Sequence, residues 1–160
     1  MFAQTFEQAR VSRRDVLRLG GAAVVTALIA GLPLPVGASP RDAKQRLTEL
    51  TKGADLQKGR ILIDLPPLTQ DGKRTRIHLT VDSPMIETDF VKAVHVLAER
   101  NTVPDIASYF FGPMSGKVDI TTRIRVAKSQ TIIVAAEMSD GSVYYAKARC
   151  NVARGAGGCG

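Results

Sequence analysis

The sequence has no tryptophan, and only two cysteines and two histidines occur among its 160 residues. Aromatic residues make up 5%, which argues against a base-stacking platform for single-stranded nucleic acid. Two cysteines are too few for a disulfide scaffold or a four-thiolate zinc site. We therefore expect no metal, no resident cofactor and no nucleic-acid partner, and we expect the chemistry to depend on very few residues.

The N-terminal segment has the pattern of an export signal. Arg13 and Arg14 precede Leu17, and an apolar run over 19–34 ends in the small residues of 35–38. Consecutive arginines before such a run are typical of a twin-arginine signal, which exports folded proteins. The run is short and interrupted by glycine, so it is a poor membrane span. We predict that 1–38 is a cleaved signal peptide, that the protein is periplasmic, and that it has no stable membrane anchor.

The rest of the chain has the hydrophobic content of one folded domain, since 44% of all residues are hydrophobic. Ser39 and Pro40 suit the start of a helix and Gly53 suits its end, which predicts a short N-terminal helix within 39–53. Residues 54–153 then alternate between apolar and polar side chains, as strands do. About seven short strands with turn signals between them predict an all-β fold, an immunoglobulin-like antiparallel β-sandwich.

Two of the predicted strands are apolar on both faces. They are Val91–Ala98 and Thr131–Ala136. A strand without a polar face must lie under a second layer or be covered by a partner protein. Asp140-Gly141 lies between two strand patterns and predicts a hairpin turn there.

The last seven residues, 154–160, contain Gly155, Gly157, Gly158 and Gly160 around Cys159. Glycine has no side chain to bury and is costly to order, so we predict a flexible C-terminal arm that exposes Cys159. The thiolate is the nucleophilic form of cysteine, and no base lies beside Cys159 in the sequence. We therefore expect the thiol to be activated only when the arm enters the cleft of a partner.

Cys150 has two interpretations. The period of two places it on the buried face of the last strand, where cysteine acts as a small hydrophobic residue. Alternatively, the glycine-rich segment lets Cys159 fold back onto Cys150, which would then be a resolving thiol. The second interpretation would make the chain a thiol redox protein.

The sequence shares several stretches with a known family. These are Asp82-Ser83-Pro84-Met85, Val91-Lys92-Ala93-Val94-His95, Ala98-Glu99-Arg100-Asn101, Ser115-Gly116-Lys117, Thr122-Arg123-Ile124-Arg125-Val126-Ala127, Ser129-Gln130 and Gly157-Gly158-Cys159-Gly160. The chain thereby resembles the SoxY family, the sulfur-carrier subunits of the periplasmic thiosulfate-oxidising (Sox) system. The terminal Gly-Gly-Cys-Gly is the most specific element.

The resemblance implies a covalent carrier and not an enzyme. It implies that Cys159 carries thiosulfate-derived sulfur, that the chain pairs with SoxZ, and that the doubly apolar strands suit that interface. It further implies transient partners: SoxAX couples thiosulfate to the cysteine, SoxB hydrolyses off sulfate, and in some organisms SoxCD oxidises the remaining sulfur. Departures from the family occur in the loop 70–75 and in the approach from Cys150 to the glycines. A paralogous carrier of a related sulfur pathway and a pure interaction module are therefore further hypotheses.

Overall fold

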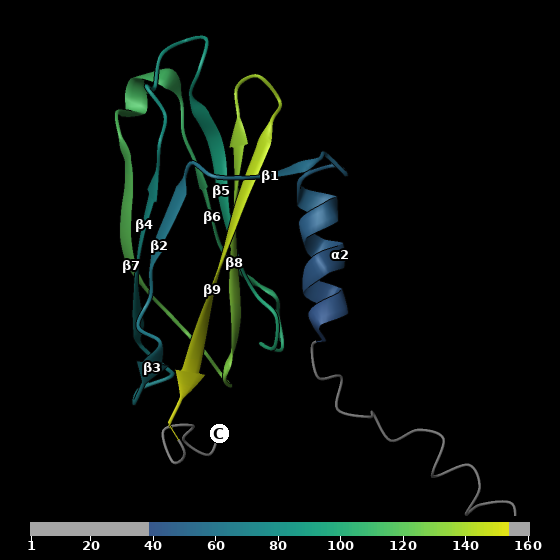
Figure 1. Ribbon diagram of the computed structural model, residues 1–160, viewed down its shortest axis with the longest axis vertical. Coiled ribbons are helices and arrows are strands. Elements are labelled where there is room, and N and C mark those ends of the chain that lie inside the picture. Colours follow the sequence, from purple (N-terminus) through teal and green to yellow (C-terminus); the bar gives the residue numbers. More distant parts are fainter. Residues whose placement is uncertain (1–38, 154–160) are drawn as a thin grey trace, which may run out of the picture. The chain divides into compact units, whose positions relative to one another are not determined.

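The computed structural model describes residues 39–153, which form one short helix and nine strands in two sheets (Figure 1). The elements are α2 (Pro40–Leu50), β1 (Leu56–Lys58), β2 (Ile61–Asp64), β3 (Leu68–Thr69), β4 (Thr75–Val81), β5 (Val91–Ala98), β6 (Asp105–Phe110), the 3₁₀ turn η1 (Pro113–Ser115), β7 (Val118–Ile124), β8 (Gln130–Met138) and β9 (Val143–Val152). The predicted signal peptide, 1–38, and the predicted arm, 154–160, lie outside the described residues.

The two sheets form the predicted immunoglobulin-like sandwich. The larger sheet has the order β1-β9-β8-β5-β6, and the smaller has the order β2-β4-β7. Long neighbouring strands are antiparallel, while the short β1 and β3 both run parallel to β9. The chain therefore leaves the larger sheet after β1, forms β2 in the smaller sheet and returns to β9 as β3.

The core lies between the sheets and follows from the alternation along the strands. In β4, Ile77 and Leu79 are fully buried, whereas Arg76 between the buried positions is exposed. In β5 and β8, Val96 and Val134 face each other across the ladder and belong to the same core cluster. Burial of these apolar side chains is the main favourable contribution to folding.

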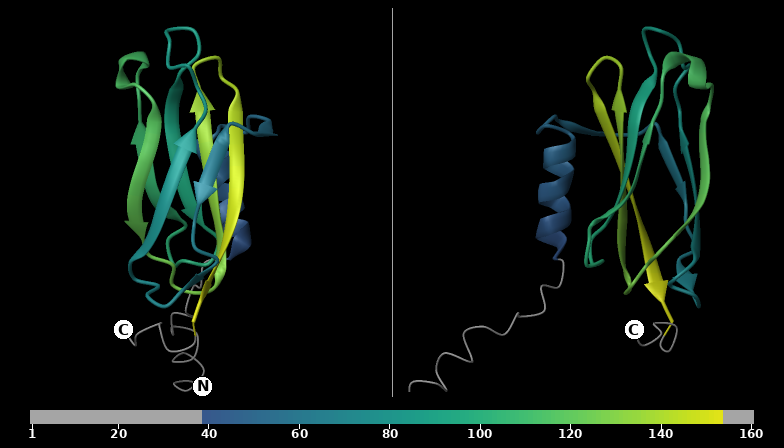
Figure 2. Two further views of the ribbon diagram at one scale, coloured as in Figure 1. Left: turned by 60° about the vertical axis from the view of Figure 1, so that its left-hand side comes forward. Right: turned by 180° about the vertical axis from the view of Figure 1, so that it is seen from behind.

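Helix α2 supplies the second layer that the doubly apolar strands require. Leu47 packs against Leu97, Ile133, Ala135 and Val143, which lie on the outer face of the larger sheet. Figures 1 and 2 show α2 on that side of the sandwich. The chain thus covers these strands with its own helix, and the side chains under Leu47 are not free for the SoxZ contact that the resemblance assigned to them.

The helix begins where the sequence predicts, with Ser39 as its N-cap residue and Pro40 in its first turn. The backbone N–H of Ser39 donates a hydrogen bond of 2.7 Å to the Asp42 carboxylate. An acidic side chain in the first turn also interacts favourably with the helix dipole. At the other end, Gly53 has a φ of +74° and its N–H bonds to the carbonyl oxygen of Thr48. No helix between residues 39 and 153 is long and apolar enough to cross a membrane.

The hairpin predicted at Asp140-Gly141 is present between β8 and β9. The Asp140 carboxylate accepts hydrogen bonds from the backbone N–H and the hydroxyl of Ser142, at 2.8 and 2.7 Å. These bonds hold the pKa of Asp140 below its ordinary value. Gly141 has a φ of +86°, a conformation that glycine adopts without steric cost.

Candidate functional site

Strand β9 leads directly to the cysteine-containing segment and carries Cys150 near its end. Cys150 pairs with Gln130 of β8, and its side chain is fully buried in the main core cluster. Its Sγ lies 3.7 Å from the carbonyl oxygen of Asn151, and burial raises the pKa of its thiol. Cys150 is therefore a neutral core residue, as the period-two pattern indicated.

The last described residues are held in place by three hydrogen bonds that their backbone N–H groups donate. The N–H of Asn151 donates to the carbonyl oxygen of Pro67 at 2.9 Å, and that of Ala153 donates to the oxygen of Thr69 at 3.0 Å. The N–H of Val152 donates to the hydroxyl of Ser129 at 2.9 Å. These contacts fix the point at which the chain leaves the sandwich. The site residues predicted beyond it, Gly155, Gly157, Gly158, Cys159 and Gly160, lie outside the described residues.

Gly72 lies in the turn between β3 and β4, next to the end of β9. Its carbonyl oxygen accepts a hydrogen bond of 2.7 Å from the N–H of Val126. A Cβ atom at Gly72 would lie 2.6 Å from the carbonyl oxygen of Val126 and 3.3 Å from the side chain of Val152. Only glycine fits between these two segments, so the turn after β3, the end of β7 and the end of β9 depend on one another.

The register of β4 and β7 brings four arginines together on the outer face of the smaller sheet. Arg76 and Arg123 are directly opposite each other. Arg74 and Arg125 lie one residue beyond the last pair of this register, Thr75 and Ile124. All four are exposed, because the residues between them are the buried ones. We call these four residues, Arg74, Arg76, Arg123 and Arg125, the arginine ladder.

The arginine ladder has no acidic partner among residues 39–153, where the ion pairs involve other side chains. By contrast, Arg46 bonds to Asp105 at 2.7 Å and Arg60 bonds to Asp89 at 2.9 Å. Like charges directly opposite each other across a strand pair disfavour the sheet. The ladder is therefore a concentrated positive charge that the described part of the chain does not neutralise.

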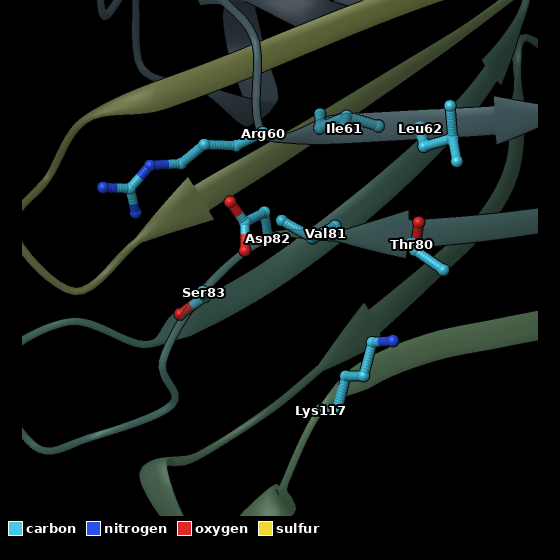
Figure 3. Close-up of a pocket in the computed structure, with 8 residues that line it drawn as sticks. All are labelled: Arg60, Ile61, Leu62, Thr80, Val81, Asp82, Ser83 and Lys117. Atoms are coloured by element: carbon cyan, nitrogen blue, oxygen red, sulfur yellow. The ribbon is translucent and has the colours of Figure 1, made fainter.

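The far end of the same sheet holds a pocket, which Figure 3 shows. Arg60 lines it, but this side chain extends away from Leu62 and Thr80, and its guanidinium binds Asp89 and stacks over the ring of Tyr144 at 5.1 Å. The hydroxyl of Ser83 bonds to the carbonyl oxygen of Asp89 and accepts from a backbone N–H. Arg60 and Ser83 are thus bonded within the fold, and the pocket lies at the opposite end of β4 from Gly72. The pocket is lined by Arg60, Ile61, Leu62, Thr80, Val81, Asp82, Ser83 and Lys117.

The two histidines lie in different sheets. His78 of β4 bonds to Asp119 at 2.8 Å on the surface of the smaller sheet. His95 of β5 is 4% exposed, and its two ring nitrogens contact Ser108 at 2.8 Å and Glu137 at 3.2 Å. Among the described residues, no three His, Cys, Asp or Glu side chains are grouped closely enough to hold a metal ion.

A family model named sulfur oxidation protein SoxY matches residues 47–159, which include the sandwich and Cys159. The chain belongs to the SoxY family. A search of curated proteins finds no match. The identity of the family supports a sulfur-carrier role in the Sox system, and it agrees with the resemblance carried by the shared sequence stretches.

Solved structures show that this SoxY-family chain shares its fold with proteins of different activity. The sulfur carrier protein SoxY from Chlorobium limicola f thiosulfatophilum is 18% identical with a TM-score of 0.58, over 68% of this chain and 89% of that one. A superoxide reductase (neelaredoxin) from Ignicoccus hospitalis is 12% identical with a TM-score of 0.54, over 72% and 94%. At these identities the likeness establishes the sandwich fold alone.

Sequence reasoning did not identify the arginine ladder as a unit. In the sequence, Arg76 belongs to one alternating stretch, and Arg123 and Arg125 belong to another. The signal was the spacing of the arginines, one residue apart in each of two segments, Arg74-x-Arg76 and Arg123-x-Arg125. The two segments meet only because β4 and β7 pair in one register, which alternation alone does not fix.

Proposed function

We propose that this SoxY-family protein carries thiosulfate-derived sulfur covalently on Cys159 and presents it to separate enzymes, without catalysing a reaction itself. The observation that carries the proposal is the contrast between the two cysteines. Cys150 is fully buried in the core, whereas Cys159 lies beyond the end of β9 within the region that the SoxY family model matches. Cys159 is therefore the thiol that remains to act as the carrier.

The loading step forms a bond between the Cys159 sulfur and the terminal sulfur of thiosulfate. The cysteine thiolate and thiosulfate together lose two electrons and give a cysteine S-thiosulfonate, and we propose SoxAX, a haem enzyme, as the oxidant. SoxB then catalyses the hydrolysis of the bond between the outer sulfur and the sulfonate group. This step releases sulfate and two protons and leaves a persulfide anion on Cys159. SoxCD oxidises that sulfur in organisms that have it.

The same proposal includes the cellular setting and the stable partner. Export by the twin-arginine signal of 1–38 would bring the folded protein to the periplasm, and SoxZ would be its heterodimer partner. Helix α2 already covers the outer-face side chains around Leu97 and Ile133. We therefore assign SoxZ to a surface of the sandwich other than the one under Leu47.

A thiol redox protein that uses Cys159 and Cys150 is the second candidate function. A resolving thiol must approach its partner until the two Cβ atoms are about 4 Å apart. The side chain of Cys150 is fully buried and points into the core, so a bond to Cys159 requires the end of β9 to open. This burial favours the carrier over the redox pair.

The experiment that tests the proposal is the intact mass of the protein from cells grown on thiosulfate, measured with and without reductant. We expect reductant-labile additions of sulfur or sulfonate that map to Cys159. The Cys159→Ser variant should carry none and should abolish thiosulfate oxidation, whereas Cys150→Ala should keep both. An unmodified Cys159, or one found only in a bond to Cys150, would contradict the carrier and support the redox protein.

A further inference from the structure

We propose that the arginine ladder is the surface on which an acidic face of the receiving enzyme docks when that enzyme takes the Cys159 segment into its active site. The inference rests on the proposed carrier function, because it assumes that enzymes act on an adduct at Cys159. To that function it adds the surface of the sandwich that the enzyme contacts and the kind of side chain that makes the contact. The occupant is a protein surface rich in Asp and Glu.

The composition of the ladder points to a large anionic partner. Arg76 and Arg123 are opposite each other and Arg74 and Arg125 extend the same two strands, so four guanidinium groups share one exposed patch. Lys73, the residue before Arg74, and Lys128, three residues after Arg125, are exposed as well. The guanidinium groups of the ladder make no ion pair within 39–153. Arginine presents several donors in a planar fork that binds carboxylates in pairs.

The carboxylates nearest to the ladder, Asp64, Asp71 and Asp119, form no ion pair with it. Asp119 of β7 is bonded to His78 at 2.8 Å. Asp71, in the turn before β4, accepts the backbone N–H of Lys73 at 2.9 Å. The positive charge is thus open to a partner, and it lies on the side of the sandwich opposite helix α2, as Figures 1 and 2 show for β4 and β7.

The position of the ladder ties it to Cys159. Val126, the residue after Arg125, bonds to Gly72, and Gly72 lies against the side chain of Val152. Ser129, at the end of the same loop, accepts the N–H of Val152 at 2.9 Å. The six residues that follow Ala153, up to and including Cys159, reach at most about 20 Å when fully extended. An enzyme that encloses Cys159 therefore brings its surface within that distance of the root of the segment, beside the ladder.

An exposed charged patch suits the kinetics that a carrier needs. Complementary charge raises the rate of encounter by one to three orders of magnitude at low salt, while exposed ion pairs add little to the final affinity. The carrier would find each enzyme quickly and leave it again after the reaction. Since the Debye length is about 8 Å at physiological ionic strength, this contribution should fall steeply with added salt.

The test compares wild-type protein with the variant Arg76→Glu plus Arg123→Glu, both loaded with the thiosulfate adduct on Cys159. The matched control is Arg41→Glu plus Lys44→Glu, which changes the net charge equally at two exposed positions of α2. The assay measures kcat/KM and kcat of SoxB on each loaded carrier at several salt concentrations. We expect the ladder variant to lose about tenfold in kcat/KM at low salt, to approach the wild type at high salt, and to keep its kcat.

Two further measurements show that the ladder variant is otherwise intact. Its melting temperature should stay close to that of the wild type, since the two opposed, exposed positions still hold a like-charge pair, two glutamates in place of two arginines. A neutral maleimide should label Cys159 at the wild-type rate. Equal kcat/KM for wild type and ladder variant, or an equal loss in the α2 control, would overturn the docking surface while leaving the carrier function in place. Loss of binding to vesicles of anionic phospholipid with unchanged kcat/KM would overturn it in favour of a membrane surface. No turnover of the loaded wild type would overturn both proposals.

Discussion

At the scale of single residues, burial distinguishes Cys150 from an ordinary thiol. Cys150 lies among core side chains next to Gln130 of the neighbouring strand, and its sulfur contacts the carbonyl oxygen of Asn151 at 3.7 Å. A buried thiol without a nearby cation keeps its proton, because ionisation would place a charge in an apolar environment. Reactivity with thiol reagents should therefore belong to Cys159 until the protein unfolds.

This difference predicts a dependence of stability on pH. Burial raises the pKa of Cys150 in the folded state above the ordinary value of 9.0 that applies after unfolding. Above that value the unfolded state loses a proton that the folded state keeps, so the Cys150 contribution is present at lower pH and is lost as the pH rises. Urea unfolding from pH 8 to 10.5 should show a steeper fall in the free energy of unfolding for wild type than for Cys150→Ala. Parallel curves for the two proteins would contradict the burial of a protonated thiol.

At the scale of elements, Gly72 holds three segments together where β9 ends. Replacing it with alanine would place a Cβ atom 2.6 Å from the carbonyl oxygen of Val126, so the turn after β3 must move away from β7. We expect Gly72→Ala to lower the free energy of unfolding by about 1–3 kcal/mol, a typical cost of overpacking. Gly112→Ala is the control, because a Cβ atom there has no neighbour within 4 Å and its φ of −127° suits any residue. Denaturant unfolding of both variants measures this free energy. Equal values for the two variants would show that the turn moves away from β7 without a cost in stability.

Helix α2 makes a second prediction at this scale. Leu47 is 4% exposed and is the helix side chain that contacts Leu97 and Ile133 on the outer face of the larger sheet. We expect Leu47→Ala to cost about 2–4 kcal/mol, as removal of a buried leucine side chain does. Thr48→Ala, at an exposed position of the same helix, should change stability by less than about 0.5 kcal/mol. Thermal unfolding distinguishes the two, and an unchanged melting temperature for Leu47→Ala would mean that α2 does not stabilise the sheet.

The elements also show which parts of the fold sequence patterns can predict. Alternation identifies β2, β4, β7 and β9, and continuous apolar stretches identify β5 and β8. These patterns miss β1, β3 and β6: β1 is exposed at all three positions, β3 has two residues, and β6 has no clean alternation. Alternation did not predict that α2 would cover the doubly apolar strands, nor that Arg76 would lie opposite Arg123. Both depend on contacts between segments far apart in the chain.

At the scale of the whole molecule, the two ends of the sandwich differ in which charged side chains are paired within the fold. One end holds the pocket at Arg60 and Lys117, whose arginine is already paired with Asp89. The other end holds the arginine ladder, Gly72 and the last described residue of β9, from which the chain continues to Cys159. We infer that the second end is the working end of the carrier, since unneutralised charge and the root of the cysteine segment occur there together.

This arrangement predicts how the molecule responds to oxidation. Because Cys150 is fully buried, a bond between the two cysteines of one chain requires local unfolding of β9, whereas two Cys159 thiols of different molecules can meet without it. Mild oxidation of the purified protein should therefore give a reductant-sensitive dimer on a non-reducing gel. Cys150→Ala should dimerise like the wild type, and Cys159→Ser should stay monomeric. A faster-migrating monomer that is absent from both variants would instead show a disulfide between Cys150 and Cys159 of one chain. The end of β9 would then have to unfold locally in solution for that disulfide to form.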